Sequence, residues 1–311
     1  MASIDCKPSA FVVWSTAARP HTLTASVSPC IVAFASTPSS WNLRLAWMIF
    51  CFTVQIGTNL HNDYSDYVQG ADTDKRVGQP RATAKGWLTP TETCRAATAV
   101  LSVTFLSGVY LLSETQQLSN PFAWFIVISS VFNAFAYTGG PYPLGYLGLG
   151  NFSLAYAGLG DLFVLLYFGL VAVLMLPYLV SCMGQSIDWV FQISLGTSIG
   201  LLGTNIIIVN NLRDRHTDVL VNKRTTAVRF GRRFSLAEYV ICNILGYAIV
   251  IMEAVRLSSP WLLLPLVTLP LAMQETRAIF TNEGQSLNKH VGATALVQFT
   301  FSILLSIGML I

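Results

Sequence analysis

Long apolar runs, separated by short polar stretches, recur along almost the whole chain. Each is about 20 residues long, which is the length a helix needs to cross a bilayer. A backbone in hydrocarbon must bond its own polar groups, so such runs form helices. With 53% hydrophobic and 11% charged residues and a mean hydropathy of +0.57, the 311-residue chain is predicted to be an all-α membrane protein. The nine predicted transmembrane helices are residues 12–36, 43–65, 93–113, 120–139, 157–180, 189–213, 235–256, 260–280 and 291–311.

Basic residues are distributed unevenly between the two sides of this predicted bundle. Nine crossings place the termini on opposite sides. If the N-terminus is on the positive side, only Arg44 and Arg256 of the 18 Lys and Arg residues fall opposite. The positive-inside rule then predicts a cytoplasmic or stromal N-terminus. The net charge of +3 is small and scattered, so it does not indicate a nucleic-acid partner.

The remaining organisation is simple. No removable signal peptide is expected, because no short apolar region with a cleavage site follows the first ten residues. We predict a single domain, residues 1–311. The six cysteines form no CxxC pair and mostly lie in or beside apolar runs, so we expect buried thiols that form neither disulfides nor zinc sites.

One stretch, residues 55–86, begins inside an apolar run and turns abruptly polar. Gln55, Asn59, Asn62, Asp63 and Asp66 are spaced by four, three, one and three, so they form one stripe on a helix. Polar side chains of this kind cost several kcal/mol each in hydrocarbon. We therefore expect the stripe to face a wet cavity between helices.

A second polar stripe ends the run 189–213. It consists of Asn210, Asn211, Asp214 and Asp218, and the two carboxylates share a helix face because they are four residues apart. Both acidic motifs fall on the positive side. Two facing Asp clusters suit Mg²⁺, which takes one or two carboxylates and completes its coordination with phosphate oxygens.

A basic loop follows each acidic stripe. Arg81 and Lys85 follow the first, and Lys223 and Arg224 follow the second, where they could neutralise a diphosphate. The repeated order of acidic helix end and basic loop suggests two degenerate halves, about 1–150 and 151–311.

The region after the fourth apolar run is rich in tyrosine and glycine. Tyr137 could line the pocket or anchor at the membrane interface. The glycines at 145–160 follow no strand, so they are expected to form a pliable loop over the cavity mouth and no dinucleotide fold. His21 is expected to be an interfacial polar residue, and Asp161 to cap the helix that it begins.

These motifs together resemble those of the UbiA superfamily of intramembrane aromatic prenyltransferases, over nearly the whole chain. The matching segments are N62-D-Y-S-D66, R76-V-G-x-x-R81, K85-G, Y137-T-G-G-P and N210-N-L-R-D214 with D218. They look most like the 1,4-dihydroxy-2-naphthoate prenyltransferases, which make precursors of menaquinone or phylloquinone. The resemblance implies a UbiA-type helical barrel.

The resemblance also implies roles for the two motifs. Asp63, Asp66, Asp214 and Asp218 would bind Mg²⁺, with Asp72 or Asp74 as a third acidic ligand of the first motif. The residues that would support or contact diphosphate are Asn59, Asn62, Arg81, Lys85, Asn210, Asn211, Lys223 and Arg224. Asn222 departs from the family pattern, which has Gly before the Lys.

The implied reaction joins a prenyl group, polyprenyl or phytyl, to the naphthoate carbon that bears the carboxylate, with loss of CO₂ and then of a proton. Tyr137 is a candidate for the group that takes this proton. Diphosphate would leave, assisted by metal and basic side chains. An aromatic-lined pocket would stabilise the allyl cation, and a lipid-accessible groove would hold the tail. A bacterial plasma membrane or a plastid membrane would fit.

Two alternatives stay open on the sequence. Another UbiA activity would use a different acceptor, such as homogentisate, 4-hydroxybenzoate, chlorophyllide or protohaem, or would cyclise a terpene without one. An ion-coupled transporter would also place Asp and Asn in the membrane. Both acidic motifs lie at one interface instead of the midplane, and each leads into a basic loop, which favours the enzyme.

Overall fold

The computed structural model describes residues 8–72 and 77–311, and its regular structure there is entirely helical. The glycines at 145–160 therefore follow no strand in these residues, as expected. In chain order the helices are α1 (Ala10–Ala18), η1 (Pro20–Thr22), α2 (Thr24–Ser36), α3 (Trp41–Val68), α4 (Pro90–Glu114), α5 (Pro121–Ala136), η2 (Leu144–Leu147), α6 (Gly160–Val164), the π-helix η3 (Leu165–Val171), α7 (Ala172–Cys182), α8 (Trp189–Asp218), η4 (Val219–Val221), α9 (Thr226–Arg256), η5 (Pro260–Thr268), α10 (Leu269–Thr281), η6 (Gly284–Leu287) and α11 (Asn288–Leu310).

Each of the nine predicted segments coincides with helical structure. By length and composition, six helices in the described residues can cross a membrane, namely 41–68, 90–114, 160–182, 189–221, 226–256 and 284–310. Two more, Thr24–Ser36 and Pro121–Ala136, are apolar but shorter. The all-helical class is thus confirmed for the described residues, which include six candidate membrane spans, whereas the count of nine crossings and the side of the N-terminus stay predictions.

The helices begin and end for identifiable reasons. Ser40 and Asp188 cap the long helices α3 and α8 by accepting hydrogen bonds from the backbone N–H groups of Leu43 and Phe191. The first predicted run is broken because Arg19 adopts a left-handed conformation, with φ of 56°, and Pro20 starts η1. The seventh helix begins nine residues earlier than predicted, at Thr226 instead of 235, and is kinked at Gly231.

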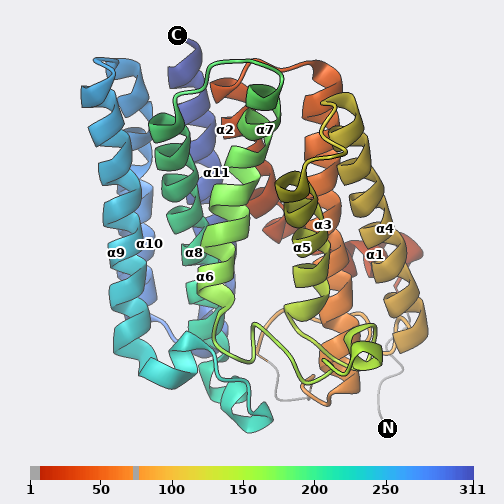
Figure 1. Ribbon diagram of the computed structural model, residues 1–311. Coiled ribbons are helices and arrows are strands. Elements are labelled where there is room, and N and C mark those ends of the chain that lie inside the picture. Colours follow the sequence, from red (N-terminus) through yellow and green to blue (C-terminus); the bar gives the residue numbers. More distant parts are fainter. Residues whose placement is uncertain (1–7, 73–76) are drawn as a thin grey trace, which may run out of the picture.

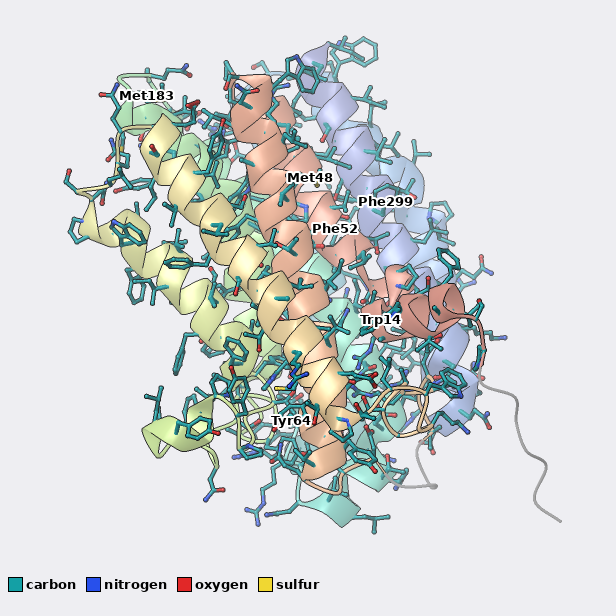
Figure 2. The ribbon with its side chains drawn as sticks, turned by 90° about the vertical axis from the view of Figure 1, so that its right-hand side faces the viewer. Trp14, Met48, Phe52, Tyr64, Met183 and Phe299 are labelled. Atoms are coloured by element: carbon teal, nitrogen blue, oxygen red, sulfur yellow. The ribbon has the colours of Figure 1, made fainter. Side chains whose placement is uncertain are left out.

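The long helices lie side by side and form a bundle (Figure 1). α3 and α8 run in the same direction, so their acidic last turns lie at the same end of the bundle, opposite the C-terminus (Figure 1). In Figure 2, Tyr64 on α3 marks this end, and Met183, just after α7, lies at the opposite end. Both acidic stripes extend helices beyond their predicted ends, to Val68 and Asp218.

The apolar interior contains two large clusters of buried side chains. One cluster joins α2, α3, α4, α5 and α7 around Trp47, and another joins α8, α9, η5, α10 and α11 around Phe301. α2 contributes to both, through Cys30 and Val32. It therefore links the cores that hold the two acidic helices in place.

The cysteines are consistent with the expectation of free thiols. Cys30, Cys51 and Cys242 are buried and unpaired. Cys94 is half-buried and Cys182, the last residue of α7, is exposed. The expectation of burial is therefore wrong for Cys182. Cys6 lies outside the described residues.

Glycine permits a close approach between η3 and α8. A Cβ added at Gly169 of η3 would lie 2.5 Å from Cα of Gly200 and 2.7 Å from the carbonyl oxygen of Gly196 on α8. These obstacles are backbone atoms, which cannot rotate away. Small residues at such contacts allow membrane helices to pack backbone against backbone.

We therefore expect Gly169→Ala to lower the free energy of unfolding by about 1–3 kcal/mol through overpacking. Thermal unfolding of the purified protein in detergent would measure this as a lower midpoint. Gly292→Ala on α11 is the matched control, because a Cβ added at Gly292 would have no neighbouring atom within 4 Å. A midpoint for Gly169→Ala equal to or above that of Gly292→Ala would contradict the close packing.

Candidate active site

The first acidic motif is closed by an arginine from the loop that follows it. Asp63 and Asp66 lie on one face of α3, because they are three residues apart. Arg81 Nη1 donates to Asp63 Oδ1 at 2.7 Å and Arg81 Nη2 to Asp66 Oδ2 at 2.9 Å. The backbone N–H of Ala82 donates to Asp63 Oδ2 at 3.2 Å. Both carboxylates are therefore buried with charge-assisted partners.

The charge on Arg81 is secured by this arrangement. Burial alone lowers the pKa of its guanidinium, but the negative charges of Asp63, Asp66 and Asp72 outweigh burial and raise the pKa above its ordinary value. Asp72 Oδ1 lies 3.8 Å from Arg81 Nε, which makes it the third carboxylate around the same guanidinium. Its competitor Asp74 lies outside the described residues.

The break in the first run brings another arginine to this motif. Arg19 follows α1 in its left-handed conformation and its Nη2 donates to Asp63 Oδ1 at 2.5 Å. The Asn59 amide donates to the carbonyl oxygen of Ala18 at 2.9 Å, and Gln55 contacts Thr22 at 3.5 Å. The predicted polar stripe of α3 thus anchors the broken segment, a contact that helix periodicity could not reveal.

The second acidic motif carries its own arginine. Arg213 Nε donates to Asp214 Oδ1 at 2.8 Å and Arg213 Nη2 donates to Asp214 Oδ2 at 2.6 Å. Arg213 Nη2 also donates to Asn210 Oδ1 at 2.8 Å. Lys223 Nζ lies 3.9 Å from Asp218 Oδ1. Asn222 before it is left-handed, with φ of 55°. Asn tolerates this conformation better than most residues other than Gly, so the departure from the family's Gly keeps the turn.

Tyr156, in the glycine-rich segment, joins the two motifs. Its hydroxyl donates to Asp66 Oδ1 at 3.3 Å, and Lys223 Nζ lies 5.7 Å from its ring centroid. Its carbonyl oxygen also accepts from the backbone N–H of Arg224 at 3.1 Å. Burial and then the charge of Asp66 raise the Tyr156 pKa above its ordinary value, so the phenol stays protonated as a donor. The acidic C-terminal ends of α3 and α8 therefore lie close together at one end of the bundle, which we call the rim.

A cavity lies between the motifs, with about 1060 Å³ of empty space including its open part. The residues lining it that the sequence had singled out are Gln55, Asn59, Asn62, Asp66, Arg81, Tyr137, Asn210, Asn211 and Lys223. Asp63 reaches it through Arg19 and Arg81, which line it. Asp214 and Asp218 are buried beside Arg213 and Lys223.

Two predicted basic residues do not join this cavity. Lys85 and Arg224 are exposed and are not among the lining residues. Lys85 lies in the turn after Arg81, and Arg224 Nε contacts Asn222 at 3.3 Å. A basic residue near a motif in sequence does not necessarily turn toward it, because loop geometry decides the direction of the side chain.

Several lining residues were missed or misread from sequence, namely Arg19, Thr22, Thr138, Asp161 and Thr226. The expectation that Asp161 caps the helix is wrong, because the N-cap of α6 is Leu159 and no side chain forms a cap hydrogen bond there. Its side chain is only 5% exposed and its oxygens accept from the Asn211 amide at 3.2 Å and the Thr226 hydroxyl at 2.5 Å. Position at a helix start gave no signal for this role, since the partners come from α8 and α9.

A second cavity, mainly apolar, adjoins the first. It has about 660 Å³ of empty space including its open part and extends to the buried Trp47 and Phe50 of α3. The residues that line both cavities are Thr58, Tyr137, Val164 and Phe168. A polar chamber at the rim thus continues into an aromatic chamber within the bundle.

The carboxylates fit Mg²⁺ as pairs. Within residues 8–72 and 77–311, no three His, Cys, Asp or Glu side chains gather into a ready metal site. Mg²⁺ needs only one or two carboxylates when phosphate oxygens and water complete its shell. Asp63 and Asp66 offer this donor set on α3, and Asp214 and Asp218 offer it on α8.

Removing the guanidinium of Arg81 would leave two buried carboxylates short of a partner. We expect Arg81→Met to lower the free energy of unfolding by about 3–5 kcal/mol, the usual cost of breaking a buried ion pair. Thermal unfolding in detergent without Mg²⁺ would detect it. Lys85→Met, an exposed change on the same loop, is the control and should leave the midpoint nearly unchanged. Equal midpoints for the two variants would disprove the role given to Arg81.

Comparison with known proteins places this geometry in context. The model of the UbiA prenyltransferase family matches residues 23–304. The chain is 32% identical over 280 residues to 1,4-dihydroxy-2-naphthoate octaprenyltransferase of Mycobacterium tuberculosis, covering 88% of each chain. It is 31% identical over 277 residues to the Escherichia coli protein of the same name, covering 86% of this chain and 84% of the relative.

Solved structures show the same fold at low sequence identity. A UbiA homolog from Archaeoglobus fulgidus bound to GPP and Mg²⁺ superposes with a TM-score of 0.59 at 13% identity, covering 94% of this chain and 99% of that chain. The same homolog bound to DMAPP and Mg²⁺ gives a TM-score of 0.58. The helical arrangement is therefore shared.

Proposed function

The chain belongs to the UbiA prenyltransferase family, and from that premise we propose that it transfers a prenyl group from its diphosphate to 1,4-dihydroxy-2-naphthoate, with loss of CO₂, in menaquinone or phylloquinone biosynthesis. The names of the bacterial relatives support this acceptor. The observation that carries the proposal is the continuity of a charged rim chamber with an aromatic chamber through shared residues. A prenyl diphosphate has this same order of charged head and apolar tail.

The rim residues suit the diphosphate head. Asp63, Asp66, Asp214 and Asp218 would hold Mg²⁺, with Asp72 beside Arg81 as a further carboxylate. When bound, Mg²⁺ supplies positive charge at the leaving oxygens. The complexes of the Archaeoglobus homolog with GPP or DMAPP and Mg²⁺ support this dependence.

The cationic side chains would pair first with the carboxylates and then with the diphosphate. In this structure Arg19 and Arg81 neutralise Asp63 and Asp66. If Mg²⁺ were held by the carboxylates, these guanidiniums and Lys223 would be available to donate to the phosphate oxygens. Asn59, Asn62, Asn210 and Asn211 add neutral polar groups to the same chamber. Positive charge would then gather where the diphosphate leaves.

The aromatic chamber suits the hydrocarbon. Phe163 and Tyr167 stack at 5.8 Å on its wall, and Trp47 stacks on Phe50 at 5.0 Å. Ring faces stabilise a developing allyl cation, and their bulk excludes water that would otherwise capture it. Tyr137 lies where the two chambers meet, and we propose that it helps to orient the reacting groups.

The activity test uses membranes containing the protein, Mg²⁺, 1,4-dihydroxy-2-naphthoate and a prenyl diphosphate. We expect a prenylated naphthoquinol and CO₂, detected by mass spectrometry and by release of labelled CO₂. Asp63→Asn and Asp214→Asn should each lower the rate about 100-fold or more, since electrostatic stabilisation of the leaving group is lost. Asp188→Asn is the control, because Asp188 caps α8 at the opposite end. Wild-type activity in the Asp63 and Asp214 variants would reject this site.

The donor and acceptor are resolved by two series of substrates. Diphosphates from geranyl to solanesyl, with phytyl, test which tail the aromatic chamber accepts. Homogentisate and 4-hydroxybenzoate, each with the preferred donor, test the alternative acceptors. We expect the naphthoate to give the highest kcat/KM, and a higher value for another acceptor would reassign the substrate. Of the two host membranes, bacterial relatives favour the bacterial plasma membrane over a plastid membrane.

A further inference from the structure

Asp161 differs from the other carboxylates of the rim chamber. Its side chain is buried and lines the chamber, yet it comes from α6 and belongs to neither acidic motif. No Lys, Arg or His forms an ion pair with it in the part of the chain that the structure describes, whereas Asp63, Asp66 and Asp214 each face an arginine. A buried carboxylate without a cationic partner is unusual, because burying charge is costly.

Two neutral donors hold this carboxylate in place. Asn211 Nδ2 donates to Asp161 Oδ1 at 3.2 Å and Thr226 Oγ1 donates to Oδ2 at 2.5 Å. These donors come from α8 and α9, so three helices fix the orientation of Asp161. An ionised carboxylate can accept about four hydrogen bonds. Acceptor capacity therefore remains on a carboxylate that lines the chamber.

The position of Asp161 relative to the two chambers is informative. The preceding Gly160 packs against Tyr137, since a Cβ there would lie 3.2 Å from the Tyr137 hydroxyl oxygen. Val164, one helical turn after Asp161, lines both chambers, as Tyr137 does. Asp161 thus lies beside the junction of the charged and aromatic chambers. If the head and tail of a prenyl diphosphate occupy these chambers, its reactive carbon lies at this junction.

We propose that Asp161 is the catalytic base that accepts the hydroxyl proton of the aromatic acceptor, an inference that rests on the proposed prenyl transfer. The acceptor needs electron density on its ring, and a phenolate supplies more than a phenol. Tyr137 is less suited to this task, because a phenol with an ordinary pKa of about 10 is protonated at neutral pH and donates. Of the two carboxylates that line the chamber among the described residues, Asp66 pairs with Arg81, whereas Asp161 has no ion pair there and has been given no metal role.

The proposed step balances as follows. The hydroxyl O–H bond breaks and the proton passes to an Asp161 oxygen. The C–O bond of the prenyl diphosphate breaks with its electron pair going to diphosphate, and the ring carbon bearing the carboxylate forms the new C–C bond. The carboxylate then leaves as CO₂, its bonding pair restoring the aromatic ring as a phenolate. Asp161 returns the proton to that oxygen, so no ring proton has to be removed.

Asp161→Asn tests the proposal with little change in shape. We expect kcat with the naphthoate to fall about 100-fold or more, the usual contribution of general base catalysis. Binding of radiolabelled prenyl diphosphate in the presence of Mg²⁺ should be unchanged, unlike in Asp63→Asn. Asp161→Glu should recover part of kcat, because it restores a carboxylate. Thr226→Val, which removes one donor and keeps the base, should lose less than Asp161→Asn.

A second readout separates a base from a merely structural carboxylate. Acceptors with a more acidic hydroxyl need less help in losing the proton, so the loss in Asp161→Asn should shrink as acceptor acidity rises. A loss equal for all acceptors, a near wild-type kcat in Asp161→Asn, or loss of Mg²⁺-dependent donor binding would each overturn the proposal. Absence of prenylated product from the wild-type protein with every acceptor would instead overturn the proposed function.

Discussion

The site depends on pairing buried carboxylates with guanidinium groups. Asp63 and Asp66 are almost fully buried near the end of α3, a helix whose first half is mostly apolar. Charges in such a place are tolerated only when partners surround them. Arg81 supplies one partner to both carboxylates, and Arg19 supplies another to Asp63. The loop and the broken first helix are thereby drawn onto the end of α3, and this closes one side of the chamber.

The second acidic helix follows the same principle with different parts. Arg213 precedes Asp214 directly and folds back on it, and it also reaches Asn288 at 3.1 Å. Asn288 in turn donates to the carbonyl oxygen of Val77 at 3.0 Å, on the loop of the first motif. The two motifs are therefore held together through α11 as well as through Tyr156. A rim assembled from several elements can bind a ligand between them without a soluble domain.

The polarity of the interior changes along the bundle, and this change organises the proposed chemistry. Charge and amide groups gather at the rim, whereas aromatic and aliphatic side chains line the adjoining chamber. Low polarity around an ionic site strengthens each electrostatic contact and also makes each unpaired charge costly. For this reason the Asp161 carboxylate stands out, because within residues 8–72 and 77–311 its hydrogen bonds come from the neutral side chains of Asn211 and Thr226.

The sequence by itself determined the membrane class, the helical segments and the two acidic stripes. These follow from local properties, since apolar length and a repeat of 3.6 residues are visible without knowing any neighbour. The sequence also indicated that the loops after the acidic stripes are positively charged, but not which basic side chains turn inward. The Arg81 side chain is buried, whereas that of Lys85 is exposed. Only the tertiary structure decided that Arg19 reaches Asp63, that Tyr156 bridges the motifs and that Asp161 enters the chamber. Each of these contacts joins residues more than 40 positions apart in the sequence. The packing of the helices brings these residues together, so no local sequence pattern could predict the contacts.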